Sequence, residues 1–136
     1  MNLSEKLVEL RIATRSATMC ESVNGKPKNT LSLKTKVLFL LKDKSLPPLD
    51  IMTTLHLAKT NLALLTTEMA QENLITKEKS STDKRAVYYS ITEEGKRYLS
   101  SRLEAIELSL KKAFQGDEYK KAYEILDEAT DILSFL

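Results

Sequence analysis

The sequence has 136 residues, the size of one ordinary domain. Its residues are 42% apolar and 29% charged, with three glycines and three prolines, which excludes a disordered chain, collagen and a loop-rich β-sandwich. We therefore predict a mainly helical globular protein. No apolar run approaches the roughly 18 residues that a membrane span needs, so we expect no membrane association.

The inventory of reactive side chains is small. A single cysteine, Cys20, cannot form an internal disulfide, and no signal segment opens the chain, so we expect a cytoplasmic protein. One histidine, His56, and one cysteine argue against a metal cage and a nucleophilic Cys–His pair. We predict that the protein is not an enzyme, with no catalytic residues, no metal and no cofactor.

The net charge of +2 is unevenly distributed. Residues 1–48 hold nine Lys/Arg and four Asp/Glu, residues 49–98 hold seven of each, and residues 99–136 hold five and eight. The basic excess therefore belongs to the N-terminal third and the acidic excess to the C-terminal third.

A first helix is predicted over about residues 2–22. Asn2 can cap it, and Glu5 can return the hydrogen bond as in a capping box. Its apolar stripe needs a partner surface and consists of Leu3, Leu7, Leu10, Ala13 and Ala17.

The centre of the chain predicts a helix-turn-helix. After an apolar helix over about 31–41, two short helices follow over 50–55 and 58–71, joined by a tight turn at His56. The continuous run from Val37 to Leu41 favours a central, buried helix, with a ligand-cavity wall as the alternative.

A β-hairpin with a long tip is predicted next. Residues 74–76 and 86–92 are rich in β-branched and aromatic side chains, and the polar stretch 77–85 between them is expected to be a turn or loop. Tyr88 and Tyr89 alternate along the second strand, so we expect one in the core and one exposed, with stacking on a nucleic-acid base as the alternative.

Two helices complete the chain. Thr92 can cap the first, which carries acids in its first turn, and a break at Gly116-Asp117 separates it from the second. Their apolar stripes, spaced by three and four residues, need a partner surface, as does the stripe of the first helix. The acids at helical spacing are expected to be solvated faces rather than acid–base pairs: Glu104, Glu107, Asp127, Glu128 and Asp131.

A helix-turn-helix followed by a hairpin with a basic tip is a winged helix, and here the residues resemble a known family. Asp83-Lys84-Arg85-Ala86 resembles the D-x-R-A wing motif of the MarR family of bacterial transcription regulators. Ile91-Thr92-Glu93-Glu94-Gly95 resembles that family's L-T-x-x-G start of the long helix. The resemblance implies a mainly α fold with a small β-hairpin wing: one domain over 1–136, with a winged-helix lobe at about 31–98 and dimerisation helices at about 2–22 and 93–135.

The resemblance implies a homodimeric transcription regulator that binds double-stranded DNA. A small aromatic effector would release the protein from the DNA. A two-fold dimer would bind a pseudo-palindromic operator, with recognition helices in the major groove and basic wings in the minor groove. The alternative is a winged-helix protein–protein interaction module with weak or no sequence-specific DNA binding.

The candidate DNA contacts lie on the second short helix and the wing. The N-terminal residues of a helix about 10–12 Å wide contact base edges in the major groove. The long guanidinium of Arg85 suits the minor groove, whereas Asp83 is expected to brace Arg85 or its loop, since phosphates repel a carboxylate. The predicted contacts are Lys59, Thr60, Asn61, Ala63, Lys77, Lys79, Lys84 and Arg85.

Three positions depart from the family's pattern. His56 replaces the usual turn glycine, and Ala58 replaces the Ser or Thr that caps the recognition helix. Leu64 stands where an arginine often contacts phosphate, which leaves Lys59 as the only basic residue of this helix. An exposed Leu64 and the neutral charge of residues 49–98 favour the protein-interaction alternative.

Cys20 has two interpretations. One branch of the family senses peroxide through a cysteine near the N-terminus. No tyrosine occurs in the first 87 residues to hold a thiolate, so we favour a packed, unreactive thiol.

Overall fold

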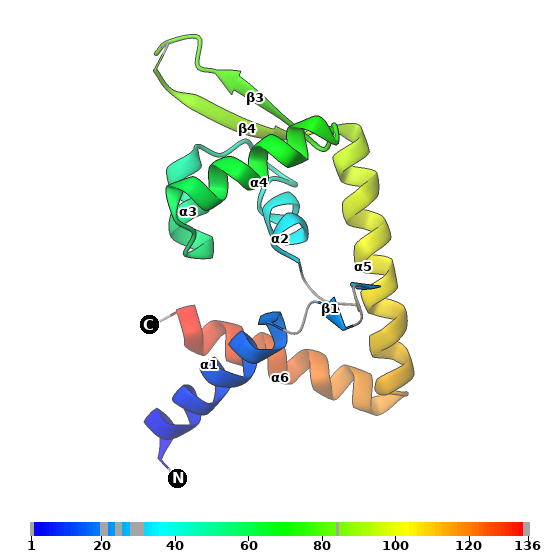
Figure 1. The fold of residues 1–136 in the computed structure, drawn as a ribbon. Helices are drawn as coiled ribbons and strands as arrows, with labels where there is room; N and C mark the ends of the chain where they lie inside the picture. Colours follow the sequence, from blue (N-terminus) through cyan, green and yellow to red (C-terminus); the bar gives the residue numbers. More distant parts are fainter. Residues whose placement is uncertain (1, 20–21, 24–25, 28–31, 84, 135–136) are drawn as a thin grey trace. The chain divides into compact units, whose positions relative to one another are not determined.

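The computed structural model describes residues 2–19, 22–23, 26–27, 32–83 and 85–134. It contains six helices and two short antiparallel hairpins within these residues (Figure 1), which confirms the predicted mainly α class. The elements are α1 (Leu3–Met19), β1 (Ser22–Val23), β2 (Lys26–Pro27), α2 (Leu33–Leu40), α3 (Pro48–Leu55), α4 (Lys59–Gln71), β3 (Ile75–Lys79), β4 (Val87–Ile91), α5 (Glu93–Ala113) and α6 (Asp117–Ser134).

The chain divides into two compact units, Met1–Arg102 and Leu103–Leu136. The first contains the winged-helix lobe and the first half of α5, and the second contains the rest of α5 and α6. No described helix is both long enough and apolar enough to cross a membrane.

The start of α1 is a capping box. The Glu5 amide donates to Asn2 Oδ1 at 3.0 Å, and the Asn2 amide donates to Glu5 Oε2 at 2.8 Å, as predicted. The predicted end at residue 22 is wrong, because α1 ends at Met19 and Ser22–Val23 pairs with Lys26–Pro27. The signal that was overlooked is the Asn-Gly pair between these segments in the sequence, a frequent hairpin signal.

The lobe has one apolar core beneath α4 and the wing. Val37, Leu38 and Leu41 are fully buried, which confirms core packing for this run, although Phe39 on the same stretch is 46% exposed. The other buried apolar side chains come from α3, α4, the wing and α5: Ile51, Leu62, Met69, Leu74, Ile75, Tyr89 and Leu99.

The helix-turn-helix forms as expected. α3 begins two residues before the predicted Asp50, because Pro48 occupies the first helical turn, where a missing amide proton costs nothing. His56 takes the left-handed conformation with φ 54°, which a β-branched residue would resist. Ala58 precedes α4 and supplies no side-chain cap.

The wing is more regular than predicted. β3 extends to Lys79, so Lys77 and Lys79 lie in a strand rather than in a loop. Their register, Lys77 with Tyr89 and Lys79 with Val87, gives their backbone groups ladder partners, which outweighs the low strand propensity of lysine. Leu46 adds a one-residue bridge to Tyr89, with two backbone hydrogen bonds of 2.9 and 3.1 Å.

The end of α4, the start of β3, the end of β4 and the start of α5 meet at one junction. The Thr92 hydroxyl donates to the Asn73 carbonyl at 2.7 Å and accepts from the Gly95 amide at 2.9 Å, so Thr92 caps α5 as predicted. Asn73 ends α4 with φ 62°. A Cβ on Gly95 would lie only 2.2 Å from the Leu74 carbonyl oxygen, so this contact requires glycine.

The α5–α6 turn uses Gly116 at φ 60°. The Tyr119 hydroxyl donates to the Glu107 carboxylate, and this bond raises the pKa of Tyr119. No residue of α6 is buried, and its exposed apolar side chains include Tyr123, Ile125 and Leu126.

The close contact at Gly95 predicts that a larger residue at this position destabilises the lobe. We expect Gly95→Ala to lower the free energy of unfolding of the lobe by about 3 kcal/mol, the upper end of overpacking effects, because a backbone carbonyl cannot rotate away from the new methyl group. Urea unfolding followed by circular dichroism measures this loss.

Gly116→Ala is the matched control. Its Cβ would meet open space, so only the left-handed φ opposes the change, at about 1–2 kcal/mol. Equal losses for both variants would contradict the role assigned to the Leu74 carbonyl.

Candidate nucleic-acid interface

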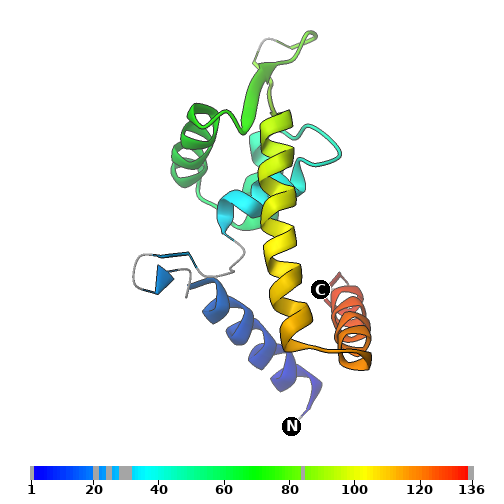
Figure 2. The ribbon, with the colours of Figure 1, turned by 90° about the vertical axis from the view of Figure 1, so that its right-hand side faces the viewer.

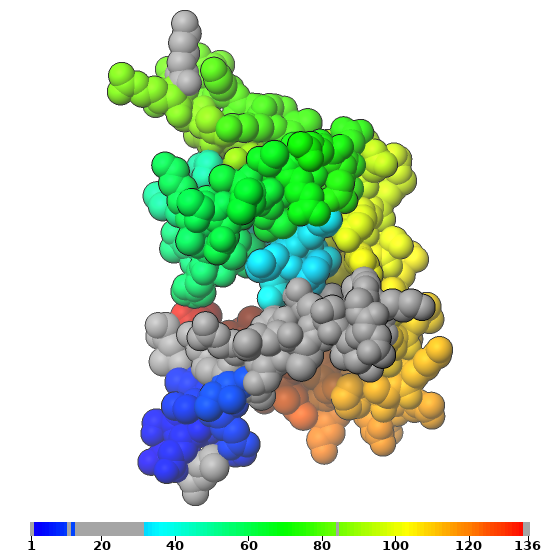
Figure 3. Space-filling model, viewed as in Figure 1, coloured from blue at the N-terminus to red at the C-terminus, as the bar shows by residue number. Residues whose placement is uncertain are grey.

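The α4 helix lies on the surface of the lobe with one whole side open to solvent (Figure 3). Its N-terminal residues Lys59, Thr60, Asn61 and Ala63 are all exposed, so each is accessible to a partner. The opposite side is anchored in the core by Leu62, Thr66 and Met69.

The helical repeat sorts these side chains by direction. At about 100° per residue, the side chains that point directly away from the core are Thr60, Leu64, Thr67 and Gln71. Asn61 lies about 100° around the helix from Thr60, towards Glu68. Ala63 lies on the other flank and lines a pocket next to the wing. The four predicted contacts on α4 therefore spread over more than half of its circumference.

The wing projects from the lobe beyond α4 (Figure 2). Lys77 and Lys79 lie on the same face of the hairpin as the buried Ile75 and Tyr89, because side chains two residues apart share a face. No ion pair between described side chains involves either lysine. Both charges are therefore available on the side where α4 lies.

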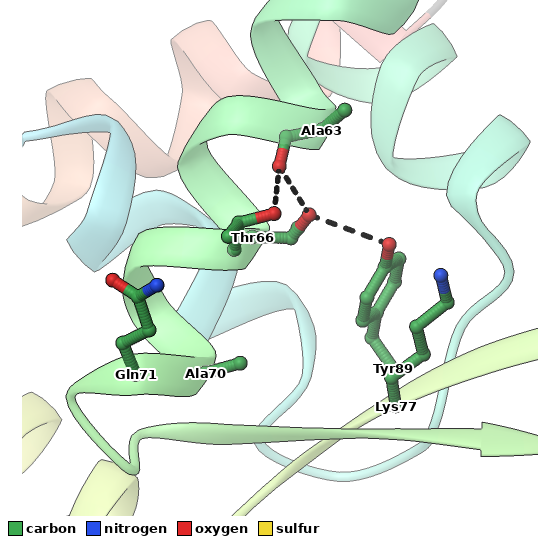
Figure 4. A pocket seen from close by; sticks show the side chains of 7 residues that line it. Ala63, Thr66, Ala70, Gln71, Lys77 and Tyr89 are labelled. Carbon is green, nitrogen blue, oxygen red and sulfur yellow. Dashed lines mark hydrogen bonds between the residues drawn. The ribbon is translucent and has the colours of Figure 1, made fainter.

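A pocket of about 410 Å³ lies between α4 and the wing (Figure 4). The Thr66 hydroxyl donates to the Leu62 carbonyl at 2.8 Å and lies 3.3 Å from the Tyr89 hydroxyl. Tyr89, with Lys77 beside it, forms the wing side of the pocket. The other lining residues come from α4: Ala63, Thr66, Thr67, Ala70 and Gln71. The contact between Thr66 and Tyr89 links the candidate recognition helix to the wing.

The wing tip is held by its own backbone. The Arg85 amide donates to Asp83 Oδ1 at 3.0 Å, and the Ser80 amide donates to the Ala86 carbonyl at 2.9 Å. Asp83 thus braces the loop, one of the two roles considered for it. The Arg85 side chain is exposed and takes part in no ion pair between described residues, while Lys84 lies outside the described residues.

Glu68 of α4 and Glu72, which directly follows this helix, are paired with a lysine of α2. Lys34 Nζ lies 2.7 Å from Glu72 Oε1 and 3.6 Å from Glu68 Oε1. Partial burial of Lys34 opposes its charge, but the hydrogen bond to Glu72 and the two carboxylates outweigh it and raise its pKa. Lys34 therefore offsets part of the negative charge that these two carboxylates would present to a polyanion approaching α4.

Sequence reasoning missed the Lys34 ion pairs, the Leu46 bridge and the pocket. The i, i+4 spacing of Glu68 and Glu72 indicates one acidic edge of α4, but only tertiary packing brings Lys34 to it. The expected split of the wing tyrosines is confirmed, since Tyr89 is buried and Tyr88 is 37% exposed. Cys20 lies outside the described residues.

The described residues contain no group of three or more His, Cys, Asp or Glu side chains that could hold a metal ion. His56 has its backbone in the turn and its side chain exposed. The site therefore offers hydroxyl, amide and apolar groups on a helix, beside the amines and guanidinium of a wing.

The fold is a winged helix of the MarR type, and solved structures confirm it. The transcriptional regulator BldR from Sulfolobus solfataricus superposes with a TM-score of 0.75 at 18% identity, covering 100% of both chains. MarR itself superposes with a TM-score of 0.66 at 14% identity, again over 100% of both chains. YusO from Bacillus subtilis reaches a TM-score of 0.64 at 18% identity, over 96% of this chain and 99% of its own.

No protein-family model matches the sequence, and the search of curated proteins found no relative. The shared property is therefore the fold, at identities too low to carry residue roles from one chain to another.

The Lys34 ion pairs predict that the stability of the lobe depends on pH in the alkaline range. We expect Lys34→Met to lower the free energy of unfolding by about 1 kcal/mol at neutral pH, because the pairs are partly exposed. The Lys34 pKa is raised in the folded state above its ordinary 10.5, so the contribution is complete below pH 10.5 and is lost as the pH rises through the folded pKa.

The measurement is the difference in unfolding free energy between the wild type and Lys34→Met across this pH range. A difference that grows with rising pH would contradict the assignment. Lys36→Met serves as a control for the loss of a lysine on the same helix, because Lys36 takes part in no ion pair between described residues.

Proposed function

We propose that the protein is a cytoplasmic, homodimeric DNA-binding transcription regulator. The observation that carries the proposal is the shared orientation of α4 and the two wing lysines, Lys77 and Lys79, on one side of the lobe. BldR, whose fold this chain shares, is a transcriptional regulator. The proposal assigns no catalytic role to any residue.

In the proposed complex, α4 enters the major groove by its N-terminal half. Lys59 contacts phosphate, Thr60 contacts a base or a phosphate, and Asn61 offers a donor and an acceptor to adenine. Lys77 and Lys79 contact the backbone beside the groove, and the Arg85 guanidinium enters the minor groove, where the negative potential is strongest. With a single lysine on α4, the wing supplies most of the electrostatic attraction.

The second unit supports the dimeric part of the proposal. Tyr123, Ile125, Leu126 and Ile132 of α6 are each more than half exposed, so this helix has apolar surface that a second chain would cover. Two-fold symmetry then presents two α4 helices to half-sites about one helical turn, roughly 34 Å, apart.

The proposal includes release by a small effector. The pocket between α4 and the wing supports it, because a molecule lodged there would bind between the two elements assigned to DNA. Such a ligand weakens DNA binding only to the extent that it prefers the DNA-free state.

A protein-interaction module remains the second candidate function, favoured by the exposure of Leu64. Replacing Arg85 by glutamate separates the two functions, because DNA binding should collapse while binding to a protein through α4 should survive.

We expect Arg85→Glu to reduce DNA affinity at least tenfold, because the variant places a negative charge in the minor groove. The measurement is fluorescence anisotropy on the duplex that the purified protein selects from a random pool. Lys112→Glu, at the end of α5, is the matched charge control and should bind normally.

The salt dependence tests the electrostatic part of the proposal. We expect the logarithm of the DNA association constant to fall with the logarithm of the salt concentration, with a slope of about −0.9 for each phosphate contact. An affinity independent of salt would refute the assigned lysine contacts.

A further inference from the structure

We propose that Leu64 is a specificity-determining residue that recognises the C5-methyl group of thymine in the major groove. This inference rests on the proposed DNA-binding function. It adds one prediction about the bases of the operator: each half-site has a thymine that faces the middle of α4.

The position of Leu64 is the first step. Its side chain is 74% exposed, the largest exposure of any large hydrophobic residue described between positions 32 and 102. Thr60 lies one turn before it and Thr67 one turn after it on the stripe that points directly away from the core. Leu64 therefore stands at the centre of the surface that would enter the groove.

The surroundings of Leu64 favour DNA over a protein partner. Stable protein interfaces are built around clustered aromatic and aliphatic anchors, and Leu64 has no large apolar neighbour on the exposed stripe of α4. An isolated apolar side chain flanked by hydroxyls instead matches a major groove, where the thymine methyl is the apolar group on an otherwise polar edge.

The chemistry of the stripe favours thymine over guanine. Guanine is recognised by the paired donors of arginine or lysine, and the stripe carries neither, since Lys59 at the first residue is the only basic residue of α4. Asn61, beside the stripe in the N-terminal half of α4, offers the amide group that pairs with adenine. Leu64 therefore completes a surface that matches A·T base pairs.

The test replaces thymine by deoxyuridine, which removes the methyl group and leaves the hydrogen-bonding edge unchanged. The probe is the duplex selected from a random pool, compared by fluorescence anisotropy with the same duplex carrying deoxyuridine in one half-site position at a time. We expect the wild-type protein to bind at least one deoxyuridine duplex about fourfold more weakly, the effect of one buried methyl group.

The expected result for Leu64→Ala is that this discrimination falls to less than twofold at the same position. Leu49→Ala is the matched control, because Leu49 is another exposed leucine of the lobe, 67% exposed on α3, and its loss should leave the fourfold discrimination intact. Circular dichroism establishes that both variants fold, as expected for exposed positions.

Two results would overturn the inference while leaving the proposed function in place. One is equal affinity of the wild type for every thymine and deoxyuridine duplex, and the other is unchanged discrimination in Leu64→Ala. Failure to bind any duplex, even at low salt, would overturn the proposed function together with the inference. Binding of Leu64 to a protein in the absence of DNA binding would have the same consequence.

Discussion

The contact between the Gly95 backbone and the Leu74 carbonyl is the constraint on which the lobe depends. It lets the first turn of α5 approach the start of β3 more closely than any side chain would permit. Thr92 reinforces this approach by bonding the Asn73 carbonyl on one side and the Gly95 amide on the other. The end of α4, the base of the wing and the origin of α5 therefore share one fixed point.

From that point outward, α4 and the wing are linked by two further contacts. Tyr89 lies against Thr66 of α4 and bonds through its backbone to Leu46, so one wing residue touches the helix and the segment that precedes α3. The wing lysines and the exposed stripe of α4 are consequently held in a common orientation. In the proposed DNA complex, recognition by the two elements then requires little reorganisation of the lobe, which favours affinity.

The sequence predicted those features that depend on residues close together along the chain. The Asn2–Glu5 capping box, the Thr92 cap and the tight turn at His56 each follow from a side chain and its immediate neighbours. The Lys34 pairing did not follow, because its partners Glu68 and Glu72 lie far away in the sequence. The extension of β3 to Lys79 did not follow either, because pairing with β4 outweighs the low strand propensity of lysine. For the candidate site, sequence placed its residues on α4 and the wing, but their directions around α4 needed the structure.

Under the proposed dimerisation, the exposed apolar side of α6 makes the folding of this helix depend on the concentration of the protein. A helix of this length draws little stability from its own hydrogen bonds and depends on whatever covers its apolar side. In the proposed dimer, the cover is a second copy, so mass action couples the order of residues 103–136 to the abundance of the protein. A regulator built in this way has a threshold concentration below which its two recognition helices are not yet held together.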